Sequence, residues 1–340
     1  MLPSADFIAG DLGLLLGNAD CRAWRRTRNG AARELVNSGG WVQGRAEQSQ
    51  FGAAPTTMTG MARVSFDEIG YWSEVKLAIV KEYATAYSAI LSAQRKPALH
   101  HVYIDAFAGA GAHVSKTTQT MVPGSPLNAL AVTPPFKEHH LIDYDGSKVE
   151  SLRSLVGDRT DVSIHEGDCN NLLLTTVFPR VRYEDYRRGL CLLDPYGLTL
   201  RWEVMRVAGS MKSIEFFLNF PIMDMNRNAL WSDPSGTATE DIERMNAFWG
   251  DESWRQAAYA EQGKLFGGFD ATRHGGNDRV VQAFRERLKK VAGFKYVPEP
   301  MPMRNTRSAI VYYLFFASHS DTGRKIVESI FAKYKTKGVT

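Results

Sequence analysis

Cysteine is scarce in this sequence: only Cys21, Cys169 and Cys191 occur in 340 residues, and they are not spaced as zinc ligands. This scarcity argues against a disulfide framework and a zinc motif, so a protein of the reducing cytoplasm is expected. The eight histidines show no His-x-x-x-His or similar ligand spacing, so no metal is expected either.

Long apolar runs are also missing. The longest, AIVYYLFFA at 309–317, is too short to cross a bilayer and suits a buried strand, so no membrane association is expected. The formal net charge of +4 predicts no general attraction to nucleic acid, although a local basic patch could still bind one. The length suits one large α/β domain with additions.

Residues 1–60 differ from the remainder of the chain, because they are rich in Gly, Ala, Arg and Ser and show no sustained period. Three interpretations stay open: a disordered tail, a basic arm, or translation from upstream of a true start at Met58 or Met61. The run LGLLLG has no basic segment before it, so a signal peptide is not expected. A helical segment at 61–98 and a main domain at 99–340 would follow.

Order is expected to begin near residue 66, with a packing helix whose apolar stripe includes Val75, Ile79, Tyr83 and Tyr87. Ser73 would cap this helix, and its lysines, Lys76 and Lys81, would lie in solvent; Ser125 would cap a later helix that begins in GSPLNALAV. Strand-like and helix-like segments then alternate, which predicts a mostly parallel sheet with right-handed crossovers. The expected strands are HHVYIDAFA, EHHLIDYD, DVSIHEGDC, GLCLLDPYG and IEFFLNFP.

The end of the chain departs from this alternation. GFKYVPEPMPMR and SAIVYYLFFAS lack a helix between them, so they predict an antiparallel strand pair, followed by a last helix, TGRKIVESIFAKY. A helical insertion is expected at 224–277, with a capping box from Thr237 to Glu240. Its large side chains would form a small core or, alternatively, a substrate cap: Trp231, Trp249, Trp254 and Phe266.

Polar residues follow all five expected parallel strands. In an open parallel sheet the carboxyl ends of the strands meet at the edge where ligands bind. One such residue could be a helix cap, but five at the same edge indicate a site. They are Asp105 with Gly109 and Gly111, Asp143 with Asp145, Glu166 with Asp168, Asp194 with Tyr196, and Asn219.

The segment YIDAFAGAGAH at 103–113 is either a ligand-binding loop or a tight turn packed in a core. Its glycines would let the backbone approach a ligand. Because residues 112–123 separate it from the next helix, a pyrophosphate on that helix is disfavoured. Asp105 would repel phosphate, so the loop favours a ligand with an ammonium or sulfonium group, and S-adenosylmethionine carries both.

These motifs resemble known ones. Asp-x-Phe-Ala-Gly-x-Gly after a strand resembles motif I of class I methyltransferases, and DPYG resembles their motif IV, close to the Asp-Pro-Pro-Tyr of amino-group methyltransferases. The order of YWSEVKLAIVKEY, YIDAFAGAGAH, GSPLNAL, EGDCNNLL, LLDPYGLTLRW, LNFPIMDMNRN and YYLFFASHSDTG resembles the three-Cys-motif partner protein family, TcmP, over roughly residues 66 to 335. The resemblance implies a Rossmann-like class I methyltransferase fold and partnership with a separate three-cysteine-motif protein.

The resemblance also implies roles for particular residues. Asp105, Phe107, Gly109 and Gly111 would belong to the cofactor loop; Asp143 would hold the ribose, with Asp145 as its rival; Asp168 would meet the adenine, with Cys169 or Asn170 beside it. Asp194, Pro195 and Tyr196 would face the methyl acceptor, where an aromatic ring can stack on a flipped base. Here DPYG lacks one proline of the amino-group motif, which puts base methylation in doubt.

Three hypotheses follow. The first is an S-adenosylmethionine-dependent methyltransferase that acts on a nucleic acid or another macromolecule. The second is a Rossmann-like partner subunit of a three-cysteine-motif protein, without transfer activity. The third is a nucleotide-binding module that uses the same acidic residues.

Overall fold

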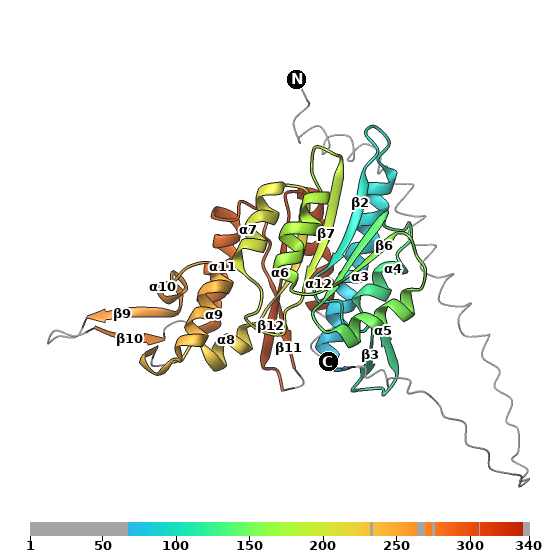
Figure 1. Ribbon diagram of the computed structural model, residues 1–340. Coiled ribbons are helices and arrows are strands. Elements are labelled where there is room, and N and C mark those ends of the chain that lie inside the picture. The colour runs from blue at the N-terminus through green and yellow to red at the C-terminus, as the bar shows by residue number, and fades with distance from the viewer. Residues whose placement is uncertain (1–66, 232–233, 264–268, 274–275, 306, 336–340) are drawn as a thin grey trace, which may run out of the picture. The chain divides into compact units, whose positions relative to one another are not determined.

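The computed structural model describes residues 67–231, 234–263, 269–273, 276–305 and 307–335 (Figure 1). The expected extension at 1–60 therefore lies outside the described residues. The largest element is a seven-stranded sheet. Its strands are β2 (His100–Asp105), β5 (Glu138–Asp143), β6 (Val162–Glu166), β7 (Arg187–Leu193), β8 (Ile214–Phe220), β11 (Met301–Arg304) and β12 (Ile310–Ala317).

The strand order is β11-β12-β8-β7-β2-β5-β6. The five strands from β8 to β6 are parallel, whereas β12 runs antiparallel to β8 and β11 antiparallel to β12. From β2 the chain builds outward through β5 and β6, then returns to the other side of β2 for β7 and β8. Strand β11 is therefore parallel to the first five strands, and only β12 is reversed. This strand order is the class I methyltransferase topology, so the expected fold class is confirmed. Its switch point lies between β2 and β7.

Helices cover both faces of the sheet (Figure 1). Successive residues of β7 explain why, since Leu190 and Leu192 join one core whereas Cys191 and Leu193 join the other. The first core includes side chains of α3 (Tyr71–Ala93), α4 (Ser125–Leu130), α5 (Gly146–Val156) and α12 (Asp321–Lys335). The second includes α6 (Cys169–Leu172), α7 (Trp202–Met211), α9 (Thr239–Trp249) and α11 (Gly276–Lys290).

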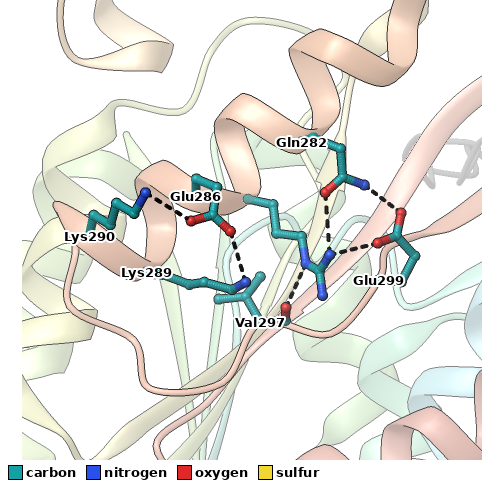
Figure 2. Close-up of polar contacts among 7 residues, drawn as sticks. Gln282, Glu286, Lys289, Lys290, Val297 and Glu299 are labelled. Carbon is teal, nitrogen blue, oxygen red and sulfur yellow. Dashed lines mark hydrogen bonds and ion pairs between the residues drawn. The ribbon is translucent and has the colours of Figure 1, made fainter.

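Helix α11 shows how a helix closes one of these cores. Its apolar side chains, Val280, Val281, Phe284 and Leu288, are buried. The side chains of its polar face pair with one another and with the chain that leads to β11 (Figure 2). Lys289 and Lys290 pair with Glu286 on the same helix, and Gln282 donates a hydrogen bond to Glu299 beyond it. The polar contacts of this face therefore tie α11 to the segment that follows it.

Smaller elements complete the described part. A short sheet joins β1 (Glu68–Ile69), β3 (Ala112–Ser115) and β4 (Met121–Pro123). The chain between α6 and β7 forms a π-helical turn at Leu173–Val177 and a 3-10 turn at Phe178–Arg180. The region expected as a helical insertion contains α8 (Ile222–Asn228), a 3-10 turn at Pro234–Gly236, α9 and α10 (Trp254–Ala258). It also contains an antiparallel pair, β9 (Tyr259–Gly263) and β10 (Phe269–Arg273), which the sequence patterns did not predict.

Of the four large side chains expected to form a core in this insertion, Trp249 and Trp254 are buried, whereas Trp231 is 47% exposed. Phe266 lies outside the described residues. The buried pair joins the main core instead of a separate one. No helix of the described part of the chain combines the length and apolar character that a membrane span needs.

Three predicted helix caps are wrong. Helix α3 is capped by Gly70, with Ser73 inside the first turn, and α4 is capped by Gly124. Helix α9 begins after Ala238 without a side-chain cap, and the Thr237 hydroxyl is buried without a hydrogen-bond partner. In each case the backbone enters the helix at a different residue from the one whose side chain local rules favour.

Candidate functional site

A cavity of about 360 Å³ lies at the switch point, beyond the carboxyl ends of β2 and β7. Six of the residues that the sequence predicted for the site line it: Phe107, Gly109, Asp194, Pro195, Tyr196 and Asn219. Most of the remaining wall comes from the chain at 67–77, the residues that follow β8, helix α8 and Tyr312 of β12. The strand order therefore joins the glycine loop and the DPYG segment, which are some 85 residues apart in the sequence.

The two glycines of the loop have different surroundings. Gly109 has φ +64°, and a Cβ built on it would meet nothing within 4 Å. Gly111 has φ +87°, but its Cβ would lie 2.9 Å from Leu152 Cδ1 of α5. Gly109 is thus a residue beside open cavity space, whereas Gly111 allows close packing of the loop on α5 and does not line the cavity.

Asp105 is fully buried below the loop and is not among the residues that line the cavity. Its carboxylate accepts hydrogen bonds from the Phe107 amide at 3.3 Å and the Tyr103 hydroxyl at 3.3 Å. Burial raises the pKa of Asp105 to about 6, and nearby Asp194 acts in the same direction. The carboxylate therefore stabilises the turn that presents Phe107 and Gly109 to the cavity.

The acids after β5 and β6 lie along the same edge but outside the cavity wall. Asp143 accepts from the Gly109 amide at 2.8 Å, so it ties the second strand end to the glycine loop. Asp145, the alternative acid for the ribose, caps α5: its carboxylate accepts a hydrogen bond from the Ser147 amide at 2.9 Å and so already has a partner within the protein. Of the two acids after β5, Asp143 is thus the one in direct contact with the glycine loop.

The third strand end is held by local contacts. Asp168 caps α6 through the Asn170 amide and pairs with Arg201 at 3.2 Å. Cys169 is buried in the core, and burial raises the pKa of its thiol to about 12, so it is a neutral packing residue. Asn170 reaches the chain that follows β7, where it donates to the Thr199 carbonyl. In the sheet, two strands, β2 and β5, separate β6 from β7, whose end carries Asp194.

Asp194, at the end of β7, is held on both carboxylate oxygens. One pairs with the Lys76 ammonium of α3, and the other accepts from the Asn219 amide at 2.8 Å. The expectation that Lys76 lies in solvent is wrong: the residue is 7% exposed, and its ammonium lies 5.7 Å from the Tyr312 ring centre. Its spacing from Val80, Tyr83 and Tyr87, all buried on the same helix, was the signal that could have placed it.

Tyr196 stands at the rim of the cavity and is 80% exposed. Its hydroxyl donates to Asp67 at 3.3 Å, and Lys148 of α5 lies 5.5 Å from its ring centre. Lys148 also pairs with Asp67 at 2.6 Å, which lowers the pKa of that carboxyl. The rim is thus a short polar bridge from the start of the described chain to α5, with one aromatic face open to solvent.

The cavity wall carries both charge signs. Arg227 of α8 and Lys116 are exposed and line it, together with the carboxylates already described. Among the described residues, no group of three or more His, Cys, Asp or Glu side chains is placed to hold a metal ion. The arrangement can hold a polar ligand that carries a positive charge near Asp194 and accepts or donates hydrogen bonds around it.

Comparisons with known proteins give distant structural likeness only. No protein-family model matches the sequence, and no curated protein matches it. Protein LPL1258 from Legionella pneumophila aligns at 10% identity and TM-score 0.49, covering 78% of this chain and 92% of that one. A candidate S-adenosylmethionine-dependent methyltransferase from Listeria monocytogenes aligns at 13% identity and TM-score 0.35, covering 66% and 92%. A SAM-dependent methyltransferase from Leishmania major aligns at 9% identity and TM-score 0.32, covering 72% and 82%. At these scores the fold assignment rests on the strand order itself: the chain has the sheet topology of the class I methyltransferases.

Proposed function

We propose that this protein is an S-adenosylmethionine-dependent methyltransferase that acts on a nucleic acid or another macromolecule. The observation that carries the proposal is the shared cavity of the glycine loop and the DPYG segment at the switch point of the sheet. Ligands of open α/β sheets bind at this position.

The residues present fit the methyl donor. Gly109 leaves open space where any other residue would project a Cβ, and its backbone nitrogen is already oriented by Asp143. We assign Asp105, Phe107, Gly109, Gly111 and Asp143 to the loop that receives the donor, with Gly111 and Asp105 acting by shaping that loop. Asp168 and Cys169 would act at the far end of the edge, Asp168 as the polar contact and Cys169 as packing. When bound, S-adenosylmethionine supplies a methyl group on a sulfonium.

Asp194, Pro195 and Tyr196 are assigned to the acceptor side. Asp194 is fixed by Lys76 and Asn219, so its carboxylate is preoriented toward the cavity. Tyr196 offers an exposed ring on which a planar acceptor can stack. The DPYG motif departs from the amino-group pattern in two ways: it has one proline instead of two, and Gly197 follows the tyrosine.

A partner is part of the proposal. The order of motifs resembles the three-Cys-motif partner family, so we propose that the chain acts with a separate three-cysteine-motif protein. Co-purification of the two proteins expressed together would support this, and two separately migrating proteins on size exclusion would contradict it.

The direct test is calorimetry of the purified protein with S-adenosylmethionine, its demethylated product S-adenosylhomocysteine, and ATP. Binding of the first two but not ATP is expected. Binding of ATP alone would favour the nucleotide-binding module. Methyl transfer is then followed with labelled donor on DNA, RNA and protein extracts.

A second candidate is a partner subunit without transfer activity. The observation in its favour is that both Asp194 oxygens already have donors within the protein, so no oxygen of that carboxylate is left without a partner. Donor binding without transfer to any acceptor class, in the presence of the partner protein, would support this candidate.

A further inference from the structure

The carboxylates of the cavity wall are largely paired with cations that come from other elements. Three such pairs surround the cavity: Asp67 with Lys148, Asp224 with Arg244, and Asp194 with Lys76. In each of the first two pairs one partner is well exposed, so water screens the charges.

The third pair is different because it is the most buried. The side chain of Lys76 is 8% exposed and that of Asp194 is 24% exposed. The other groups that face Asp194 include Asn219 and Tyr312, which carry no formal charge, Tyr103 and Tyr196, the imidazole of His113, and the buried carboxyl of Asp105. Lys76 is therefore the cation that offsets a carboxylate in the interior of the cavity.

We propose that Lys76 sets the charge of the reacting cavity: by offsetting Asp194, it limits the attraction of the cavity for a cationic sulfonium. This inference rests on the proposed methyltransferase function. A sulfonium is positively charged, whereas the demethylated product is a neutral thioether. A cavity with one more uncompensated carboxylate would bind the charged donor more tightly than the product.

Lys76 thereby serves transfer and not only folding. The positive charge of the sulfonium is lost during methyl transfer. Strong stabilisation of this charge before transfer therefore raises the barrier to transfer, because only interactions that are stronger in the transition state accelerate a reaction. Lys76 acts through Asp194, so it is a positioning and charge-compensating residue. It also joins α3, a helix expected only to pack, to the site.

The test compares the affinities for S-adenosylmethionine and S-adenosylhomocysteine in four proteins, by calorimetry at about pH 8, where a carboxyl is ionised. Lys76→Met keeps the length of the buried stem and removes the charge. Lys81→Met is the matched control, because Lys81 lies on the same helix and is exposed. Asp194→Asn removes the carboxylate, and the double variant Lys76→Met/Asp194→Asn removes both charges.

Lys76→Met should raise the preference for the sulfonium donor over the thioether about tenfold, the effect of one unit charge several ångströms away in a partly wet cavity. Asp194→Asn should lower this preference by a similar factor, the double variant should return to the wild-type ratio, and Lys81→Met should not change it. A merely structural lysine would alter melting temperature but not the ratio.

An unchanged ratio in folded Lys76→Met overturns the inference while leaving the proposed function standing. If Lys76→Met does not fold, Asp194→Asn decides, and an unchanged ratio there has the same meaning. A wild-type protein that binds neither ligand instead refutes the proposed function.

Discussion

Replacing Gly109 by alanine separates a ligand-binding loop from a packed turn. The structure places Gly109 at φ +64° with nothing within 4 Å of a Cβ. The added methyl group therefore meets no protein atom, and it projects beside the cavity that Gly109 lines. The change costs conformational energy but creates no steric clash within the protein.

The cost can be worked out from the backbone. A residue with a Cβ loses about 1–2 kcal/mol in the left-handed region, and alanine regains roughly 0.4–1 kcal/mol by restricting the unfolded chain. The net loss is about 1 kcal/mol, which for a domain of this size lowers the melting temperature by about 2–4 °C. Donor affinity should fall at least about tenfold, since the methyl group takes space that the ligand needs.

Gly157→Ala is the matched control. Gly157 has φ +65°, and its Cβ would also meet nothing within 4 Å, but it lies after α5 and does not line the cavity. Gly157 also has ψ −152°, a backbone conformation almost restricted to glycine, so Gly157→Ala should lose at least as much stability in thermal melts as Gly109→Ala, whereas only Gly109→Ala should lose donor affinity in calorimetry. Equal donor affinity in the two variants and the wild type would remove the loop from the site and refute the reasoning.

Further expectations concern chemistry, pH and chain length. Asp194→Ala should lower methyl transfer about 100-fold or more and, by leaving the buried Lys76 ammonium unpaired, lower stability by about 2 kcal/mol; wild-type transfer of labelled methyl groups would contradict the acceptor-side assignment. Burial lowers the pKa of His140 from its ordinary value of 6.5 to about 4. Because the unfolded chain then binds more protons between these two values, the free energy of unfolding should decrease as the pH is lowered from about 6.5 to about 4, by up to about 1.4 kcal/mol per pH unit. The variant His140→Gln should reduce this slope in urea melts. A protein that begins at Met61 should melt within a few degrees of the full chain, since residues 1–60 show no core-forming pattern; a large drop in melting temperature would show that they pack on the domain.

Local patterns were sufficient where one segment decides its own structure. The apolar runs that end in Asp105, Asp143 and Asp194 predicted β2, β5 and β7, because a strand buried on both faces needs continuous apolar residues. The caps were mispredicted at Ser73 and Ser125, because the backbone path into those helices is fixed by neighbouring segments.

The sequence by itself thus determined the strands of the main sheet, its parallel class and the acids at its edge. Only the tertiary structure decided which of those acids face the cavity. Gly109 and Gly111 are alike in the sequence, yet one faces open space and the other packs against α5. Lys76 and Asp194 lie 118 positions apart, and they pair because the fold brings α3 and the end of β7 to the same cavity. A pattern along the chain carries no information on such contacts, because they form only when the strand order places distant segments side by side.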